Sequence, residues 1–229
     1  MTKRVRVLLL ALVSPLLVVP VGNASADAPP TVTISTIRST YTYGDSVELV
    51  FDINGTGPGM AFSVTVDGAK NPLIIKSSTT DGVRTAEAAA YVNFTVRAHV
   101  YDADGTTELA TAVKTITVHA QLETTVLGYH GSQGRYTVFS RGASPKFESA
   151  EYPAAPGKRC LRHIVQRQFG SAWRNVTTSA CKVEAKQGRV VWAWRGRHPS
   201  GTHFRVRPTF AGDQANLPSV GAWRYFRFR

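Results

Sequence analysis

The chain has 229 residues and a formal net charge of +12. This charge is unevenly divided, because residues 27–120 carry 6 Lys plus Arg against 10 Asp plus Glu, whereas residues 121–229 carry 18 against 5. All four Trp also lie in the second part, and so sharp a division argues against a single mixed core and favours two domains.

A secretory signal peptide is predicted at the start of the chain. Basic residues at positions 3, 4 and 6 precede an apolar stretch from Val7 to Val21, and small residues follow at Ala24-Ser25-Ala26. The longest unbroken apolar run, Val7–Val13, is far shorter than the roughly 20 residues that a membrane-spanning helix needs. We therefore expect cleavage after Ala26 rather than an uncleaved anchor, a signal peptide of residues 1–26, and a mature protein without a membrane span.

Residues 27–120 show the period-two alternation of half-buried β-strands. Between Val47 and Ile53, apolar residues alternate with Glu48 and Asp52. Similar patterns predict further strands at Thr31–Ser35, Met60–Val66, Leu73–Lys76, Gly82–Ala88, Val92–Val100 and Ala112–His119. About seven strands separated by turns favour an immunoglobulin-like sandwich for this acidic domain.

The basic second part, residues 121–229, is predicted to follow the same logic. Its predicted strands are Thr124–Leu127, Arg135–Ser140, Cys160–Phe169, Trp173–Lys182, Arg189–Trp194, His203–Phe210 and Trp223–Arg229. The segment Ser149–Lys158 is predicted to be a loop or an edge connection, because proline, present at 153 and 156, cannot donate to a ladder. The sequence therefore predicts an all-β protein of two tandem immunoglobulin-like β-sandwich domains, residues 27–120 and 121–229.

The two cysteines, Cys160 and Cys181, are predicted to form a disulfide, since an even count in an exported chain favours one. If Gly170 and Ser171 form a two-residue hairpin turn, the register of the hairpin places Cys160 directly opposite Cys181. The two sulfurs would then face each other across the hairpin. Free thiols or a metal pair are the alternative.

Two segments resemble known bacterial domains. The run Tyr41-Thr-Tyr-Gly-Asp-Ser-Val-Glu-Leu-Val-Phe51 resembles the opening strands of bacterial immunoglobulin-like domains. The runs Trp192–Arg207 and Phe210–Asn216 resemble immunoglobulin-like or fibronectin-III-like domains of secreted actinobacterial proteins, in which a Gly-rich hairpin precedes an Arg-Val-Arg strand and a Gly-Asp-x-x-Asn turn. This resemblance implies an extracellular, non-catalytic surface or matrix role and carries no catalytic residues.

The candidate binding site lies on the last two predicted strands, which are neighbours in a sandwich of this kind. If Phe204 and Val206 face the core, the alternating arginines point outward, where crowded like charges need aromatic interleaving, counter-ions or an anionic partner. The predicted site consists of Arg205, Arg207, Arg227 and Arg229, with Trp223 and Tyr225 supplying cation–π contacts. A solvated basic face without a ligand, or one covered by the acidic domain, is the alternative.

No cofactor or metal site is predicted. His198 and His203 flank a hairpin tip and make only half of a zinc site, so they are interpreted as exposed hairpin histidines. The run Asp102-Ala-Asp-Gly105 resembles the start of a calcium loop, but Val113 stands where that loop needs a bidentate Glu. A plain turn is therefore expected there.

A non-catalytic role is expected because the chain holds no nucleophile elbow, metalloprotease motif or phosphate loop. A glycosidase pair formed on folding, drawn from Glu148, Glu151 and Asp213, is the enzyme alternative. Without a folded recognition motif, nucleic acid is not the expected partner. We expect a secreted adhesion module that contacts an anionic cell-wall or extracellular polymer and is associated with the wall. A partner-binding protein or inhibitor that uses a loop such as Tyr152–Gly157 is the second interpretation.

Overall fold

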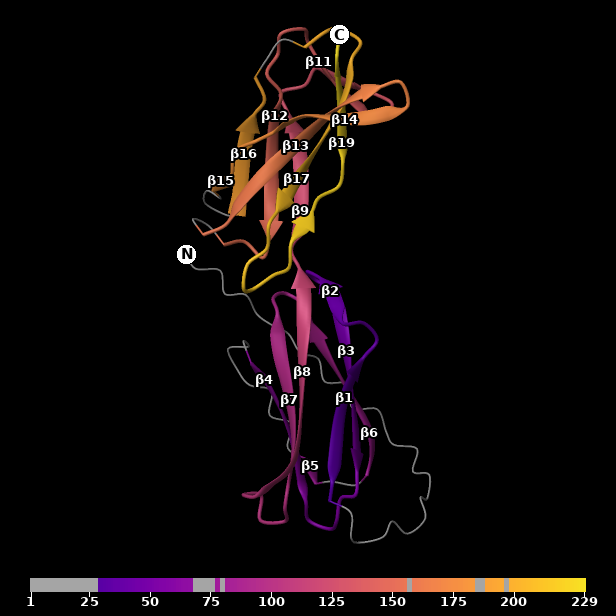
Figure 1. Ribbon diagram of the computed structural model, residues 1–229, viewed down its shortest axis with the longest axis vertical. Coiled ribbons are helices and arrows are strands. Elements are labelled where there is room, and N and C mark those ends of the chain that lie inside the picture. The colour runs from indigo at the N-terminus through magenta and orange to yellow at the C-terminus, as the bar shows by residue number, and fades with distance from the viewer. Residues whose placement is uncertain (1–28, 68–76, 79–80, 156–157, 184–187, 196–197) are drawn as a thin grey trace. The chain divides into compact units, whose positions relative to one another are not determined.

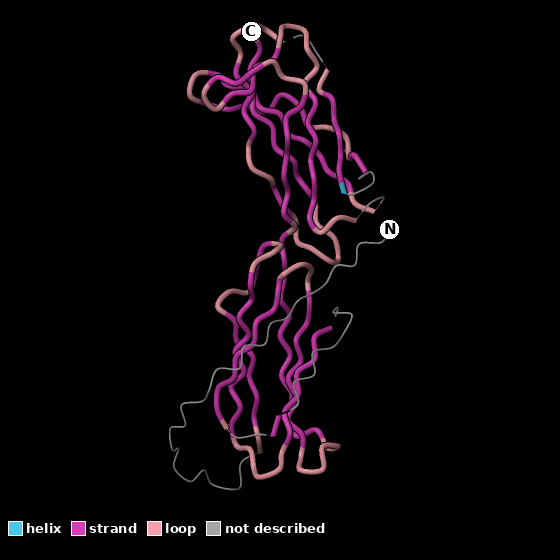
Figure 2. The backbone as a smooth tube through the Cα atoms, turned by 180° about the vertical axis from the view of Figure 1, so that it is seen from behind, coloured by secondary structure: helices cyan, strands magenta, loops and turns pink. Residues whose placement is uncertain are grey.

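The computed structural model describes residues 29–67, 77–78, 81–155, 158–183, 188–195 and 198–229 (Figure 1). The predicted signal peptide and the predicted strand Leu73–Lys76 lie outside these residues. The chain divides into two compact units, Met1–Val118 and His119–Arg229. Strands and connecting turns make up nearly all of both units, and the described residues contain no α-helix, only 3-10 geometry at Gly188 (Figure 2). Within the described part, no helix is long and apolar enough to cross a membrane.

The first unit is a sandwich of a three-stranded sheet, β1-β3-β6, and a five-stranded sheet, β2-β8-β7-β4-β5. Between the sheets lies a core in which Phe51 and Phe62 pack edge to face with ring centroids 5.7 Å apart. The strands are β1 (Thr31–Thr36), β2 (Thr40–Thr42), β3 (Ser46–Asn54), β4 (Ala61–Asp67), β5 (Ser77–Ser78), β6 (Gly82–Ala89), β7 (Phe94–Tyr101) and β8 (Glu108–His119).

The second unit pairs a three-stranded sheet, β16-β12-β9, with a larger sheet in the order β10-β11-β19-β17-β13-β14. Short strands β15 and β18 add to β13 and β17. Its strands are β9 (Gln121–Leu127), β10 (Gly131–Gln133), β11 (Tyr136–Phe139), β12 (Lys146–Tyr152), β13 (Cys160–Phe169), β14 (Ala172–Thr178), β15 (Lys182–Val183), β16 (Arg189–Ala193), β17 (His203–Phe210), β18 (Ser219–Val220) and β19 (Arg224–Phe228).

Both units have the same topology. In chain order, β1, β3 and β6 of the first unit correspond to β9, β12 and β16 of the second, and each triplet forms one three-stranded sheet. The sheet order β2-β8-β7-β4-β5 has its counterpart in β11-β19-β17-β13-β14. The predicted all-β, immunoglobulin-like class is therefore confirmed.

One predicted loop is wrong. Ser149–Tyr152 forms the end of β12, which is the central strand of its sheet and pairs with both β9 and β16. Ser149 and Glu151 are fully buried, so the strand places two polar side chains inside the sandwich. Pro153, which cannot donate a ladder hydrogen bond, comes directly after the strand, so the strand ends there and not at Ser149.

The predicted disulfide between Cys160 and Cys181 is confirmed, with the two Cα atoms 5.5 Å apart. The register that led to it holds only near the turn, where Phe169 faces Ala172. A bulge between Val165 and Gln166 then shifts the pairing by one residue, and by the end of the strand, where β13 pairs with β15, the shift is two residues and Cys160 faces Val183. The disulfide therefore joins β13 to the segment just before β15 instead of linking directly facing residues.

Candidate binding face

Strand alternation decides which side chains of β17 and β19 point outward. Phe204 and Val206 are buried in the core of the second unit, as are Phe226 and Phe228. The residues between them lie on the opposite side of the sheet and are half-buried. Arg205 and Arg207 of β17 therefore share an outer surface with Tyr225 and Arg227 of β19.

The register of the two strands separates the arginines from one another. Arg205 faces Tyr225, and Arg227 faces His203. Arg229 is exposed and follows β19, where its main-chain N–H donates to the carbonyl of Phe139 at 3.0 Å. No arginine directly opposes another in the β17–β19 ladder, so the repulsion expected of facing like charges is avoided.

Arg205 is held over two indole rings. Its Cζ lies 4.5 Å from the ring centroid of Trp173 and 4.2 Å from that of Trp223, and Arg207 lies 4.4 Å from the same Trp223 ring. The Nε of Arg205 donates to Oε1 of Gln166 at 2.8 Å. A guanidinium fixed in this way keeps its charge while losing rotational freedom.

Further rings and one more arginine continue this surface toward β11. Arg135 lies 4.2 Å from the ring centroid of Tyr225, and Tyr136 stacks on His203 with centroids 4.5 Å apart. The hydrogen bond to the hydroxyl of Tyr136 raises the pKa of Arg135. We name the whole surface the aromatic–arginine face and define it by Arg135, Tyr136, Trp173, His203, Arg205, Arg207, Trp223 and Tyr225.

The described carboxyl groups of the second unit are engaged elsewhere. Glu148 pairs with Arg189, and Glu123 accepts a hydrogen bond from the side chain of Gln121. Glu151 and Asp213 both bind Arg159 (see below). Within the described residues, no carboxylate is therefore paired with an arginine of the aromatic–arginine face.

Arg159 is the centre of a buried ionic cluster in the second unit. Its guanidinium donates to Glu151 at 2.9 Å, to Asp213 at 2.6 and 3.0 Å, to Asn216 at 2.8 Å and to the carbonyl of Pro153 at 3.0 Å. Burial alone would raise the pKa of Asp213, but these hydrogen bonds and those from backbone N–H groups outweigh it and hold the pKa below its ordinary value. Two of the three carboxyl groups considered for a glycosidase pair, those of Glu151 and Asp213, are therefore close together, but both are paired with the buried Arg159.

The histidine prediction is wrong for one residue of the pair. His198 is buried between Trp194 and Phe228, with ring centroids at 4.0 and 4.5 Å, and burial lowers its pKa. His203 is half-buried and belongs to the aromatic–arginine face. Within the described residues, no group of three or more potential metal ligands is present.

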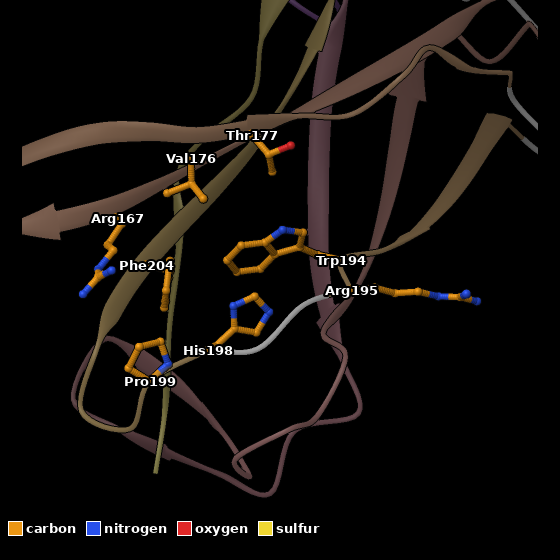
Figure 3. Close-up of a pocket in the computed structure, with 8 residues that line it drawn as sticks. All are labelled: Arg167, Val176, Thr177, Trp194, Arg195, His198, Pro199 and Phe204. Carbon is orange, nitrogen blue, oxygen red and sulfur yellow. The ribbon is translucent and has the colours of Figure 1, made fainter.

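A hollow of about 310 Å³ lies on the other side of β17. Figure 3 shows the rings of Trp194 and His198 next to each other, with the side chain of Arg195 directed away. Phe204 lines this hollow and alternates with Arg205 along β17. The hollow is therefore separate from the aromatic–arginine face.

Sequence reasoning missed four residues of the face, namely Arg135, Tyr136, Trp173 and His203. Trp173 faces Gln168 on β13, and the predicted hairpin turn already contained that register. Tyr136 faces Tyr225 through a parallel pairing of β11 with β19. A pairing between such distant segments has no local sequence signal.

No family model matches the chain, and no curated protein matches it. Among solved structures, the human OSCAR ligand-binding domain is 13% identical with a TM-score of 0.33, over 85% of this chain and 97% of that domain. A CARDB domain from Pyrococcus furiosus is 15% identical with a TM-score of 0.31, over 42% and 94%. Salmonella alpha-2-macroglobulin is 12% identical with a TM-score of 0.33, over 87% and 15%. These likenesses concern the fold alone, and the resemblance to actinobacterial domains stays a prediction.

Proposed function

We propose that the protein is an exported, non-catalytic binding module that contacts an anionic cell-wall or extracellular polymer through its aromatic–arginine face. The observation that carries this proposal is the state of Arg205. Its guanidinium is fixed over Trp173 and Trp223, and within the described residues it has no carboxylate partner. A positive charge that is oriented but not neutralised suits an external anion.

The first unit provides an internal comparison. Its strand β7 occupies the same place in the sheet as β17, and its outward basic residues are Arg97 and His99. There, Arg97 pairs with Asp67 at 3.0 Å and His99 with Glu108 at 2.8 Å. The same topology thus pairs its outer basic residues with carboxylates in one unit and supports them with aromatic rings in the other.

The aromatic rings add a second means of recognition. Flat rings next to cations offer stacking surfaces to the sugar or glycerol units of a polymer, while the guanidinium edges donate to its anionic groups. The Cys160–Cys181 disulfide supports export, because disulfides persist in oxidising compartments. The predicted signal peptide supports the same location.

The test is co-sedimentation of the mature protein with isolated cell-wall polymer. Binding should weaken steeply as salt rises from about 50 to 500 mM, because exposed charges are screened over these concentrations. Arg205→Gln and Trp173→Ala should each weaken binding by about tenfold, as the loss of a cation–π contact and its oriented charge implies. The exposed Lys146 of β12, on the other sheet, gives a charge-matched control in Lys146→Gln, which should bind as the wild type does. Salt-insensitive binding, or equal loss in the control, would refute the proposal.

A further inference from the structure

A hollow of about 240 Å³ lies where the aromatic–arginine face reaches the edge strands β10 and β11. Arg227 and Arg229 line it from one side. The β10 segment lines it from the other with His130, Ser132 and Gln133. Because β11 lies between β10 and β19, the two groups of polar residues border the same space from different strands.

Gly131 keeps this hollow open. Gly131 of β10 pairs with Val138 of β11, which pairs with Arg227 of β19. Arg227 in turn pairs with His203 of β17, so these four residues form one row across four strands. Paired residues of adjacent strands have their side chains on the same face. A Cβ at Gly131 would meet no atom within 4 Å. The missing side chain therefore leaves space directly beside Val138 and Arg227.

Five of the seven residues that line the hollow have a hydrogen-bond donor in their side chain. Gln133 lies on the same side of the sheet as Arg227, whereas Ser132 pairs with Thr137 in the row of Phe226, so its side chain lies on the opposite side, and no lining side chain is a carboxylate. Nε of Arg227 is buried and donates to no protein atom among the described residues. The main chain of Arg229 is fixed by its hydrogen bond to Phe139. A concave site that is rich in donors and cationic suits a single anionic group.

We propose that this hollow binds one phosphate group of the polymer, an inference that rests on the proposed function of the aromatic–arginine face. The oxygens of a phosphate point in tetrahedral directions, so they accept from Arg227, Arg229 and Gln133 of β10 at once. A carboxylate has two oxygens whose lone pairs lie in one plane, so it matches donors spread around a concave site less well than a phosphate does. The hollow therefore selects phosphate-bearing polymers over carboxylate polymers.

The experiment compares two polymers, poly(glycerol phosphate) and polygalacturonate, at equal ionic strength. We expect the phosphate polymer to bind about tenfold more tightly, the effect of one additional charge-assisted hydrogen bond. Gly131→Leu, which fills the hollow without removing a charge, should abolish this preference while binding of both polymers through the face persists. Arg227→Gln combined with Arg229→Gln should abolish it as well. Gly131→Ala adds only a Cβ in open space and should retain the preference and the thermal stability of the wild type.

A titration with inorganic phosphate separates the two proposals. By amide NMR, phosphate should shift the Gly131 signal, whereas acetate at the same ionic strength should not, and the indole signals of Trp173 and Trp223 should respond to polymer. Equal binding of both polymers, unchanged by Gly131→Leu, would overturn the phosphate site and leave the face standing. A phosphate shift at Gly131 without any polymer binding would overturn the proposed function and leave the phosphate site standing.

Discussion

Removing Arg159 should destabilise the second unit more than any other single arginine substitution discussed above. All five of its N–H donors have acceptors, and its side chain is 5% exposed beside a fully buried Glu151. Arg159→Met keeps the length of the side chain but leaves the Glu151 carboxylate buried without its counter-ion. Breaking a buried pair from one side typically lowers the free energy of unfolding by about 3–5 kcal/mol.

Urea unfolding followed by tryptophan fluorescence measures this loss in the intact chain, because all four Trp lie in the second unit. With a slope of about 2 kcal/mol per molar urea, a loss of about 4 kcal/mol lowers the midpoint by about 2 M. Arg189→Met, which breaks the partly exposed pair with Glu148, is the control and should lower stability by at most about 1 kcal/mol. Equal midpoints for Arg159→Met and Arg189→Met would refute the assignment of the Arg159 cluster as a structural element.

Three further outcomes concern pH and covalent structure. The pKa of Asp213 lies below its ordinary value, so the carboxylate contributes to stability at pH values above that ordinary pKa. This contribution is lost as pH falls through the lowered pKa. Arg159→Met should lack this acid-induced loss in the same urea assay. Burial lowers the pKa of His163 to about 4, so the unfolded state takes up this proton first and wild-type stability should decline as pH falls from 6.5 toward 4. His163→Phe should flatten that decline and, by losing the 2.8 Å hydrogen bond to Ser149, cost about 1 kcal/mol at pH 7. Replacing both Cys160 and Cys181 by Ser should lower the free energy of unfolding by about 3 kcal/mol, measured by urea under non-reducing conditions.

Local alternation was enough to predict the strands that carry the face. The predicted strand His203–Phe210 matches β17, and the alternation that buries Phe204 and Val206 follows from their period-two spacing. Cys160–Phe169 likewise matches β13. Each of these strands has one apolar side that must be buried, so its own sequence fixes which side faces outward.

Long-range pairing and local irregularity were not predictable in the same way. The segment that includes Ser149 and Glu151 lacks an apolar alternation, because Arg159 and His163 reach it from other parts of the chain and satisfy its buried polar groups. The bulge beside Gln166 shifts the register by one residue without a turn residue to mark it. His198 was interpreted as exposed because the rings that cover it come from separate parts of the chain, Trp194 from the residue after β16 and Phe228 from β19.

A single oxygen-for-nitrogen exchange tests whether the oriented charge of Arg205 is what binds. Gln166 accepts from Nε of Arg205 at 2.8 Å and donates to Asn175 at 2.7 Å. Gln166→Glu keeps this geometry once the Asn175 amide turns to donate, and it gives Arg205 the carboxylate partner that Arg97 has in the first unit. A half-exposed ion pair changes stability by about 1 kcal/mol or less, so the fold should persist.

Polymer binding by Gln166→Glu should nevertheless fall by about tenfold, because the guanidinium is neutralised in place and the stacked rings are unchanged. Ser171→Glu adds the same charge in the exposed turn after β13, away from Arg205, and should weaken binding much less. Equal losses in the two variants would show that net charge alone attracts the polymer. In that case the stacking of Arg205 on Trp173 and Trp223 would have only a structural role.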